Sequence, residues 1–360
     1  MVKDVKIVVG LNYGDEGKGQ MVDYFSRQGT IKGHKVLNVL SNGSAQRGHT
    51  VQLLTGERHV FKHLGSGTFA GADTYFPAQF LVNPIEFNKE YEDFYPYCMC
   101  HKDSIVVTPY HMMLNQAKEK LQKYGSCGMG VWEAVQFPIL RVWDLENRSA
   151  PELIDILREI RFTLGYEEGL PKIYWSDYLL YAFLMDCYKF VDRVNVIPNE
   201  MEVIKGITGY NTIIFENGQG LLLDQKLPDK NHLTPSNTDL TNPKDILKKC
   251  EIGKDIVETC YVTRSYMTRH GNGPFPTECN KEEISDLIGE DKTNRPNEWQ
   301  GALRYGHMDW DNAMTRIERF GETSLAITHI NELQPTVENL DFDRIYLSDG
   351  PTRLNIKISS

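Results

Sequence analysis

The sequence predicts an α/β fold with a largely parallel central sheet and helices on both faces. Short apolar runs recur along the chain, and stretches with helical periodicity separate them, which is the order of βαβ units. These runs are apolar throughout, as expected for strands that are buried on both faces. Glycine-rich polar loops follow the first two runs, and loops at the carboxyl ends of parallel strands commonly bind ligands.

The expected elements follow from this pattern in chain order. The apolar run Val5–Val9 is the first strand, and the periodic segment Met21–Arg27 is the first helix. Another helix is expected at Met112–Leu121, and the segment Glu152–Phe190 predicts a helical insert around 150–195 within a single domain, 1–360. The further strands are expected at Val36–Leu40, Val51–Leu54, Ser104–Thr108, Thr212–Phe215, Asp255–Thr263, Ser324–Thr328 and Arg344–Leu347.

The composition limits the classes of function. The 360 residues are enough for a large core, and the formal net charge of −10 argues against a general nucleic-acid binder. The seven cysteines show no paired C-x-x-C spacing, so the reduced thiols of a cytoplasmic protein are expected. No apolar run approaches the ~20 residues that cross a bilayer, so no membrane association is expected.

The loop after the first strand combines glycines with one lysine and two carboxylates. It reads Gly14-Asp15-Glu16-Gly17-Lys18-Gly19, and such a turn before a helix can aim backbone N–H groups and a cation at phosphate. The usual P-loop motif is not satisfied, because Gln20 follows the second glycine where lysine and then serine or threonine are required. A carboxylate in a phosphate cradle suits metal binding or proton transfer, so Asp15 is a candidate catalytic residue. A helix cap is the structural alternative.

A second small polar loop follows the second strand. The segment Ser41–Thr50 is rich in glycine and contains His49, and it would meet the first loop at the same edge of the sheet. An aspartate on one loop and a histidine on the other are expected where one group takes a proton and another stabilises a developing anion. A lone histidine is otherwise more often a structural residue.

Six segments together resemble the adenylosuccinate synthetase family, in that family's order along nearly the whole chain. The Gly-Pro-Phe-Pro-Thr-Glu run at 273–278 is the most specific of them. The resemblance implies a P-loop-related α/β fold, a homodimer, Mg²⁺ as cofactor, and three small-molecule substrates: a purine nucleoside monophosphate, a nucleoside triphosphate and L-aspartate. The segments are Gly14–Gly19, Gly48–Thr50, Phe215–Asp224, Thr234–Thr238, Tyr261–Glu278 and Ser348–Pro351.

The resemblance implies roles for both loops. Asp15 is expected to remove the N1 proton of a 6-oxopurine and to ligate Mg²⁺ together with the carbonyl of Gly48. A metal keeps such a carboxylate ionised, and N1–H becomes acidic as charge moves to O6. His49 is expected to act as the acid and to offset charge on the transferring phosphoryl group. The donor phosphates are expected to contact Glu16, Gly17, Lys18, Gly19, Gly48 and Thr50.

The same resemblance implies three further sets of contacts, each drawn from segments far apart in the sequence. Donor-base contacts are expected from Asn331, Ser348, Gly350 and Pro351. Contacts to the purine monophosphate are expected from Asp15, Asn42, Ser44, Gln46, Ser126, Gln219 and Thr234. Contacts to L-aspartate are expected from Thr268, Gln300 and Arg304, because an arginine can grip a carboxylate bidentately.

Three features depart from the family's pattern. Asn331 stands where the family's guanine-reading T-K-x-D segment ends in aspartate, and an amide accepts less well from N1–H and the 2-amino group of guanine. Unpaired groups cost roughly 1–3 kcal/mol, so use of ATP or dATP instead of GTP is expected unless another residue replaces the contact. Ala302 stands where the family has an arginine that also reaches the ribose 2′-hydroxyl. The segment with the family's inter-subunit arginine is shorter, and Arg141 is the nearest candidate.

These departures resemble the phage branch of the family, the 2-amino-2′-deoxyadenylosuccinate synthetases. The first hypothesis is a C–N ligase that joins L-aspartate to C6 of dGMP through a 6-phosphoryl intermediate, with ATP or dATP, on the route to 2-aminoadenine DNA. If a phage encodes the chain, the enzyme would work in the host cytoplasm. Some phage members replace the catalytic aspartate, whereas this chain keeps Asp15. The alternatives are an ordinary adenylosuccinate synthetase that uses IMP and GTP, and a non-catalytic nucleotide-binding protein on the same fold.

Overall fold

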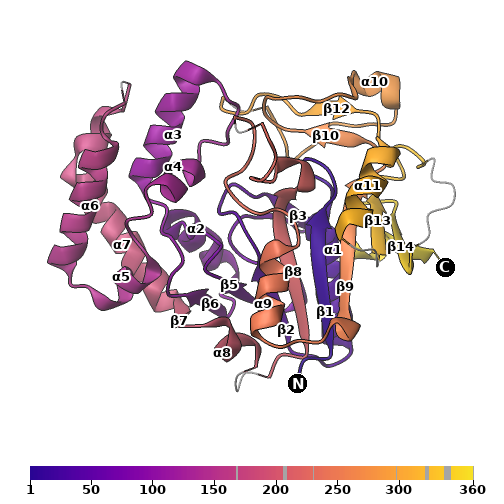
Figure 1. Ribbon diagram of the computed structural model, residues 1–360, viewed down its shortest axis with the longest axis horizontal. Coiled ribbons are helices and arrows are strands. Elements are labelled where there is room, and N and C mark those ends of the chain that lie inside the picture. Colours follow the sequence, from indigo (N-terminus) through magenta and orange to yellow (C-terminus); the bar gives the residue numbers. More distant parts are fainter. Residues whose placement is uncertain are drawn as a thin grey trace.

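A large, almost entirely parallel sheet forms the centre of the molecule (Figure 1). The computed structural model describes residues 1–167, 169–205, 209–229, 231–296, 298–320, 324–335 and 342–359. Within these ranges ten strands form the sheet, in the order β15-β14-β13-β9-β1-β8-β2-β5-β6-β7, and only the pair β14 and β15 is antiparallel. The predicted α/β class is thereby confirmed. The strands are β1 (Asp4–Gly10), β2 (Val36–Leu40), β5 (Asp73–Phe76), β6 (Cys98–His101), β7 (Val194–Ile197), β8 (Thr212–Gly220), β9 (Val257–Arg264), β13 (Ser324–Thr328), β14 (Arg344–Ser348) and β15 (Ile356–Ser359).

Helices cover both faces of this sheet. Helix α1 (Lys18–Ile31) packs Phe25 into a cluster with Val8 of β1 on one face. On the opposite face, α9 (Thr241–Lys249) and α11 (Trp310–Phe320) bury their apolar side chains in a cluster with Ile7, the next residue along β1. Successive residues of a strand point to opposite faces, so a continuous apolar run is what such a two-sided core requires.

A third apolar cluster packs against the strands β5, β6 and β7 at one end of the sheet. It buries Leu157 of α6 (Ala150–Leu164) and Phe183 of α7 (Asp177–Arg193), two helices in the segment that the sequence predicts to be helical. The remaining helices are α2 (Pro84–Phe94), α3 (Pro109–Gln122), α4 (Val131–Gln136), α5 (Val142–Asn147), α8 (Glu200–Ile204) and α10 (Lys281–Ile284), with short 3₁₀ turns η1 (Thr68–Ala70), η2 (Lys172–Trp175), η3 (Leu221–Leu223), η4 (Lys254–Ile256) and η5 (Arg353–Asn355).

Two expected strands do not belong to the large sheet. Instead of a core strand at Val51–Leu54, β3 (His49–Gln52) pairs only with β4 (Arg58–Phe61) in an antiparallel hairpin. The segment Ser104–Thr108 is also not a strand, because it forms only isolated bridges to Val82 and Arg141. Val51 and Val106 of these segments are nevertheless buried in an apolar cluster, and a short apolar run alone does not distinguish such a segment from a core strand.

A small antiparallel sheet joins three segments from the last third of the chain. It consists of β10 (Met267–Arg269), β12 (Arg304–Gly306) and β11 (Glu278–Cys279), in that order. Within the described ranges, no helix combines the length and the apolar character needed to cross a membrane.

Candidate active site

The glycine-rich loop lies between β1 and the first turn of α1, at the carboxyl edge of the sheet. Gly17 precedes the helix with a φ of 90°, in the left-handed region where glycine is favoured. A Cβ atom at this position would lie 2.8 Å from Cγ2 of Thr328, on β13. The Thr328 hydroxyl donates to the backbone carbonyl of Glu16 at 3.0 Å. The end of β13 therefore fixes the loop's conformation and its distance from the helix.

Glu16 and Lys18 form a buried pair beneath this loop. Their side chains are 3% and 2% exposed, and Lys18 Nζ lies 3.8 Å from Glu16 Oε2. The backbone N–H of Asn12 also donates to Glu16 Oε1 at 2.5 Å. Burial raises the pKa of Glu16 to about 7 despite the nearby lysine, and burial lowers the pKa of Lys18. An anionic ligand beside Lys18 would favour its charged form, so this pair responds to phosphate.

Asp15 is held by its backbone rather than by its carboxylate. Its φ is 58°, and its carbonyl accepts from Arg264 Nε at 2.6 Å. Arg264, at the end of β9, also donates to Asp291 Oδ2 at 2.8 Å. Burial opposes ionisation of Asp291, but Arg264 holds the pKa of that carboxyl well below its usual range. The chain therefore fixes the position of Asp15 while its carboxylate lines the cavity described below.

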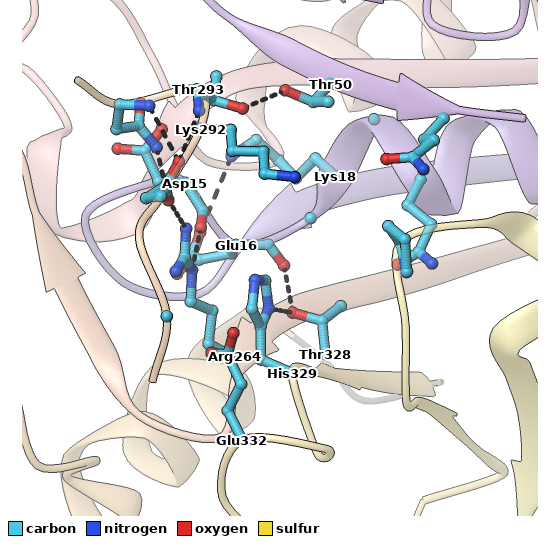
Figure 2. Close-up of a pocket in the computed structure, with 18 of the residues that line it drawn as sticks. Asp15, Glu16, Lys18, Thr50, Arg264, Lys292, Thr293, Thr328, His329 and Glu332 are labelled. Carbon is cyan, nitrogen blue, oxygen red and sulfur yellow. Dashed lines mark hydrogen bonds and ion pairs between the residues drawn. The ribbon is translucent and has the colours of Figure 1, made fainter. Parts of the chain in front are cut away.

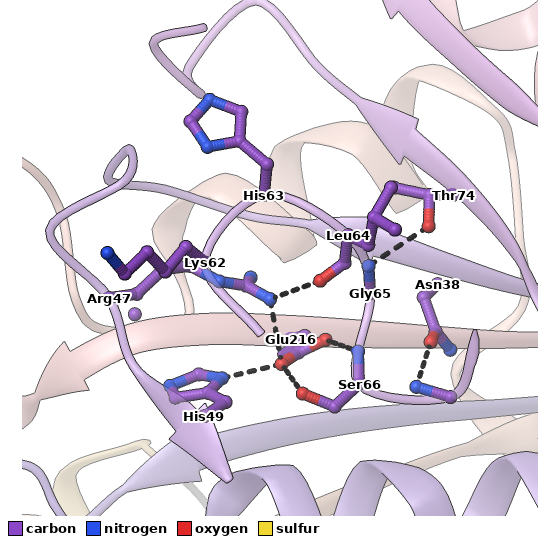
Figure 3. A network of polar contacts seen from close by, with 12 residues as sticks. Asn38, Arg47, His49, Lys62, His63, Leu64, Gly65, Ser66, Thr74 and Glu216 are labelled. Atoms are coloured by element: carbon purple, nitrogen blue, oxygen red, sulfur yellow. Dashed lines mark hydrogen bonds and ion pairs between the residues drawn. The ribbon is translucent and has the colours of Figure 1, made fainter. Parts of the chain in front are cut away.

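His49 belongs to a buried charge network on the second loop (Figure 3). Its Nδ1 lies 2.5 Å from Glu216 Oε1, and the same carboxylate accepts from Arg47 Nη2 at 3.0 Å. Ser66 donates to Glu216 through both its backbone N–H and its hydroxyl, at 2.9 and 2.5 Å. Burial opposes ionisation of Glu216, but Arg47 and His49 lower its pKa to about 2. The carboxylate is therefore ionised and accepts the Nδ1 proton of His49.

This arrangement sets the protonation state of His49. Burial lowers the pKa of its imidazole to about 4, although the hydrogen bond to Glu216 opposes the shift. At neutral pH the ring is therefore neutral, with its proton on Nδ1. Nε2 is then the nitrogen left to act on a ligand, and an arriving anion would stabilise the imidazolium form.

Both loops line a first cavity of about 390 Å³ (Figure 2). Its other walls come from the segment 289–294, from the end of β13 and from residues next to β14. The structure thus brings together, in one cavity, residues predicted to contact the donor phosphates and most of those predicted to contact its base. The predicted residues that line it are Asp15, Glu16, Gly17, Lys18, Gly19, Gly48, His49, Thr50, Asn331, Gly350 and Pro351.

A second cavity, of about 440 Å³, is lined by a different set of residues. Gln46, three residues before His49, lines it and donates to the Thr234 hydroxyl at 2.9 Å. A Cβ at Gly14 would lie 3.5 Å from the Cα of Gln219, so the glycine-rich loop is close to the wall of this second cavity. The predicted residues that line it are Gln46, Ser126, Gln219, Thr234 and Gln300.

Five predicted contact residues line neither cavity, and three of them, Asn42, Ser348 and Arg304, are held by other parts of the chain. Asn42 is buried, and its Oδ1 accepts a hydrogen bond from the backbone N–H of Gly218 at 2.9 Å. The Ser348 hydroxyl donates to Gln20 Oε1 at 3.1 Å. These five residues are Asn42, Ser44, Thr268, Arg304 and Ser348.

Some of the predicted ligand contacts carry buried polar atoms with no hydrogen-bond partner among the described residues. These atoms are the Ser44 and Thr268 hydroxyls and Gln219 Oε1. Buried polar atoms are rarely left unpaired in a folded protein. A polar ligand in or next to the second cavity would satisfy them.

The two predicted arginines are engaged elsewhere. Arg304 donates to both carboxylate oxygens of Glu278, at 2.7 and 2.5 Å, and to the carbonyls of Gly271 and Gly273. A substrate carboxylate would have to compete with Glu278 for this guanidinium. Arg141 donates to the carbonyl of Asp103 at 2.6 Å and lines neither cavity.

Several residues at the site have no counterpart in the sequence-based assignment. Arg47 and Glu216 organise His49, and the charged end of the otherwise apolar run at 212–216 is a signal that could have identified Glu216. Glu332 lines the first cavity beside Asn331, and its Oε2 accepts from the Tyr266 hydroxyl at 2.5 Å. A carboxylate therefore lies next to Asn331 in this cavity.

The donors for a metal ion are sparse. Across the described ranges no group of three or more histidine, cysteine, aspartate or glutamate side chains could hold a metal. The carboxylate of Asp15 and the residue Gly48 line the same cavity, as a shared site would require. Mg²⁺ is commonly held by one or two protein groups together with substrate phosphates, so this donor set fits an ion that arrives with a nucleotide.

Comparisons with known proteins identify the family. The family model for adenylosuccinate synthetase matches residues 7–352. The adenylosuccinate synthetase of Thermotoga maritima is 28% identical over 342 residues, covering 91% of this chain and 81% of that protein. The enzyme of Clostridium botulinum is 26% identical over 355 residues, covering 91% and 78%.

Two solved structures share the fold. The fully ligated adenylosuccinate synthetase of Plasmodium falciparum superposes with a TM-score of 0.76 at 15% identity, covering 99% of this chain and 100% of that one. The succinoaminodeoxyadenylate synthetase of cyanophage S-2L, solved with dGMP and dATP, gives a TM-score of 0.68 at 17% identity, covering 99% and 95%. The match over almost the whole chain means that this protein belongs to the adenylosuccinate synthetase family, the ligases that join aspartate to a purine nucleotide.

Proposed function

We propose that this ligase joins L-aspartate to C6 of dGMP, with ATP or dATP as the phosphate donor, and produces 2-amino-2′-deoxyadenylosuccinate for 2-aminoadenine DNA. Two substitutions in this chain support the choice of substrates. Asn331 replaces the family's guanine-reading aspartate at the donor cavity, and Ala302 removes an arginine that reaches the ribose 2′-hydroxyl in the family. The cyanophage S-2L enzyme of the same fold was solved with dGMP and dATP.

The contact between the two cavities supports the order of chemical steps. The donor occupies the first cavity, which the segments 15–19 and 48–50 line, and the purine monophosphate occupies the second, where Gln46 lies in the wall and Gln219 lies against Gly14. In the first step, O6 of the purine attacks the γ-phosphorus, the bond to the bridging oxygen breaks, and Asp15 takes the N1 proton. In the second step, the amine of aspartate attacks C6, and the C6–O6 bond breaks with release of phosphate.

The roles of the other residues follow from their positions. Lys18 and the N–H groups of residues 16–19 face the donor phosphates, while Nε2 of His49 faces the transferring group. Glu216 fixes the tautomer that leaves this nitrogen available. Mg²⁺, held by Asp15 and the carbonyl of Gly48, would neutralise charge on the phosphates and keep Asp15 ionised. We further propose a homodimer, as in the resemblance from the sequence.

A second candidate keeps IMP and GTP, and one observation favours it. Glu332 lines the donor cavity next to Asn331 and offers a carboxylate that could accept from N1–H and the 2-amino group of guanine. The retained Asp15 also matches a 6-oxopurine base of either kind. Donor choice and acceptor choice therefore need separate measurements.

The decisive experiment compares dGMP with IMP, each with L-aspartate, Mg²⁺ and ATP, by phosphate release and product mass. Turnover of dGMP in clear preference to IMP supports the proposal, and turnover of IMP alone overturns it. A second series replaces ATP with dATP or GTP in the wild type and in Asn331→Asp and Glu332→Gln variants. If Glu332→Gln alone removes GTP use, Glu332 is the guanine reader and the interpretation of Asn331 is wrong.

A further inference from the structure

The segment Gly289–Asn294, here called the 289–294 loop, forms one wall of the donor cavity. It carries Lys292, and Figure 2 shows this side chain and Lys18 projecting into the same cavity from different segments. The loop lies far from the glycine-rich loop in sequence, and no role follows for it from the site described above.

Hydrogen bonds within the 289–294 loop hold its turn, and Arg264 connects this turn to the glycine-rich loop. Asp291 Oδ1 accepts from the backbone N–H groups of Thr293 and Asn294, both at 2.9 Å. Its other carboxylate oxygen accepts from Arg264, the residue that holds the carbonyl of Asp15. Lys292 therefore sits inside a turn whose position is coupled to that of Asp15.

A second contact joins the loop to the strand after His49. The hydroxyls of Thr293 and Thr50 lie 2.8 Å apart, and Arg58 of β4 also donates to Thr293. Thr293 therefore links the 289–294 loop to both strands of the β3–β4 hairpin. Thr50 is itself one of the residues expected to contact phosphate, so the turn lies beside the expected path of the triphosphate.

Lys18 and Arg264 at this cavity are paired with carboxylates, whereas Lys292 is available to bind a ligand anion. Lys18 lies 3.8 Å from Glu16, and Arg264 is paired with Asp291. Lys292 is exposed, and in the part of the chain that the structure describes its ammonium group has no hydrogen-bond or ion-pair partner. A triphosphate brings more negative charge than the buried Glu16–Lys18 pair can balance, and the Lys292 ammonium adds a cation to those of Lys18 and Arg58 at the cavity wall.

We propose that Lys292 is a positioning residue for the donor nucleotide and binds an oxygen of its phosphate chain from the side opposite Lys18. The inference rests on the proposed donor cavity, but not on the identity of the donor base or of the purine monophosphate. The 289–294 loop then acts as a clamp whose closed turn keeps the lysine near the phosphates, while Thr293 keeps the turn attached to β3.

The test measures the KM of MgATP and kcat for Lys292→Ala, Lys292→Arg and the exposed control Lys248→Ala on α9. Charge-assisted contacts to phosphate predict a KM for MgATP raised about tenfold or more in Lys292→Ala, with kcat lowered less than about threefold. Lys292→Arg should recover most of the loss, and Lys248→Ala should match the wild type. A KM within twofold of the wild type in Lys292→Ala would overturn the inference.

Binding measurements separate this inference from the proposed function. Calorimetry with MgATP and with Mg-tripolyphosphate requires no turnover, so it reports on Lys292 even if no aspartate-dependent product forms. Weaker binding of both probes by Lys292→Ala supports a phosphate contact. Weaker binding of MgATP with unchanged binding of tripolyphosphate would place Lys292 on the sugar or base and refute the assignment.

Discussion

Glu216 is predicted to be the residue on which the stability of the second loop depends most. Its side chain is 0% exposed and accepts four hydrogen bonds, from Arg47, His49 and both donors of Ser66. The change Glu216→Gln keeps the shape and removes the charge. Arg47, whose side chain is also 0% exposed, would then be a buried cation without a counter-ion.

The magnitude follows from this loss. Removing one partner of a buried ion pair costs about 3–5 kcal/mol of unfolding free energy, because the remaining charge stays desolvated. Ser66→Ala removes only one donor to the same carboxylate, so a cost of about 1 kcal/mol is expected. Glu251→Gln is a matched control, since Glu251 is 79% exposed and its ion pair with Lys205 lies at the surface, so its unfolding free energy should match that of the wild type.

Urea unfolding followed by tryptophan fluorescence measures these differences. Activity provides a second readout. Without the carboxylate, nothing holds the proton of His49 on Nδ1 or fixes the orientation of its ring. A fall in kcat of roughly 10–100-fold is expected in the folded Glu216→Gln protein. A free-energy change below ~1 kcal/mol with unchanged kcat would show that neither Arg47 nor His49 depends on this carboxylate, and would refute the reasoning.

Three further predictions concern the site. Gly17→Ala should raise the KM of the donor and destabilise the chain by about 1 kcal/mol or more, measured by kinetics and urea unfolding, because φ is 90° and Thr328 blocks the new Cβ. Burial lowers the pKa values of His49, His63 and His111 from 6.5 to about 4, so between these pH values the three histidines bind protons only in the unfolded chain. The free energy of unfolding should therefore fall as the pH drops from 6.5 to about 4, and an unfolding free energy that is constant over this range would contradict the prediction. Chelation of Mg²⁺ should abolish turnover and its return should restore it, since the described residues offer no complete metal cage.

The fold could be predicted from the sequence where a strand contains an apolar run. The strands β1, β2, β8, β9, β13 and β14 are expected on this basis, and apolar clusters bury residues of β1, β8 and β9 on both faces. The outer strands β5 and β6 are not expected. The strand β5 begins with Asp73 and β6 ends with His101, and both are short, so no periodic signal marks them. Their burial depends on helices from the segment 84–193, which only the tertiary structure places there.

The candidate site divides in the same way. Glycine spacing and a lysine reveal the phosphate loop, because backbone geometry restricts the residue at each position. The network of Arg47, His49 and Glu216 joins distant parts of the sequence, since the histidine and the glutamate are 167 residues apart. Such a network has no local pattern, so only the register of β2 against β8, which pairs Leu40 with Glu216, brings it together.

The separation of the two cavities has a consequence for how the enzyme's specificity could have diverged. In the proposed function the donor base would contact Asn331 and Glu332 in the first cavity, whereas the purine monophosphate would contact Gln219 in the second. Among the described residues none lines both cavities, so a change in one need not alter binding in the other. The shared elements are the two loops, which act on phosphate and O6 and are indifferent to the 2-amino group. A chain can therefore keep Asp15 and His49 and still change donor and acceptor independently, which is why Asn331 and Ala302 are informative even though the catalytic pair is retained.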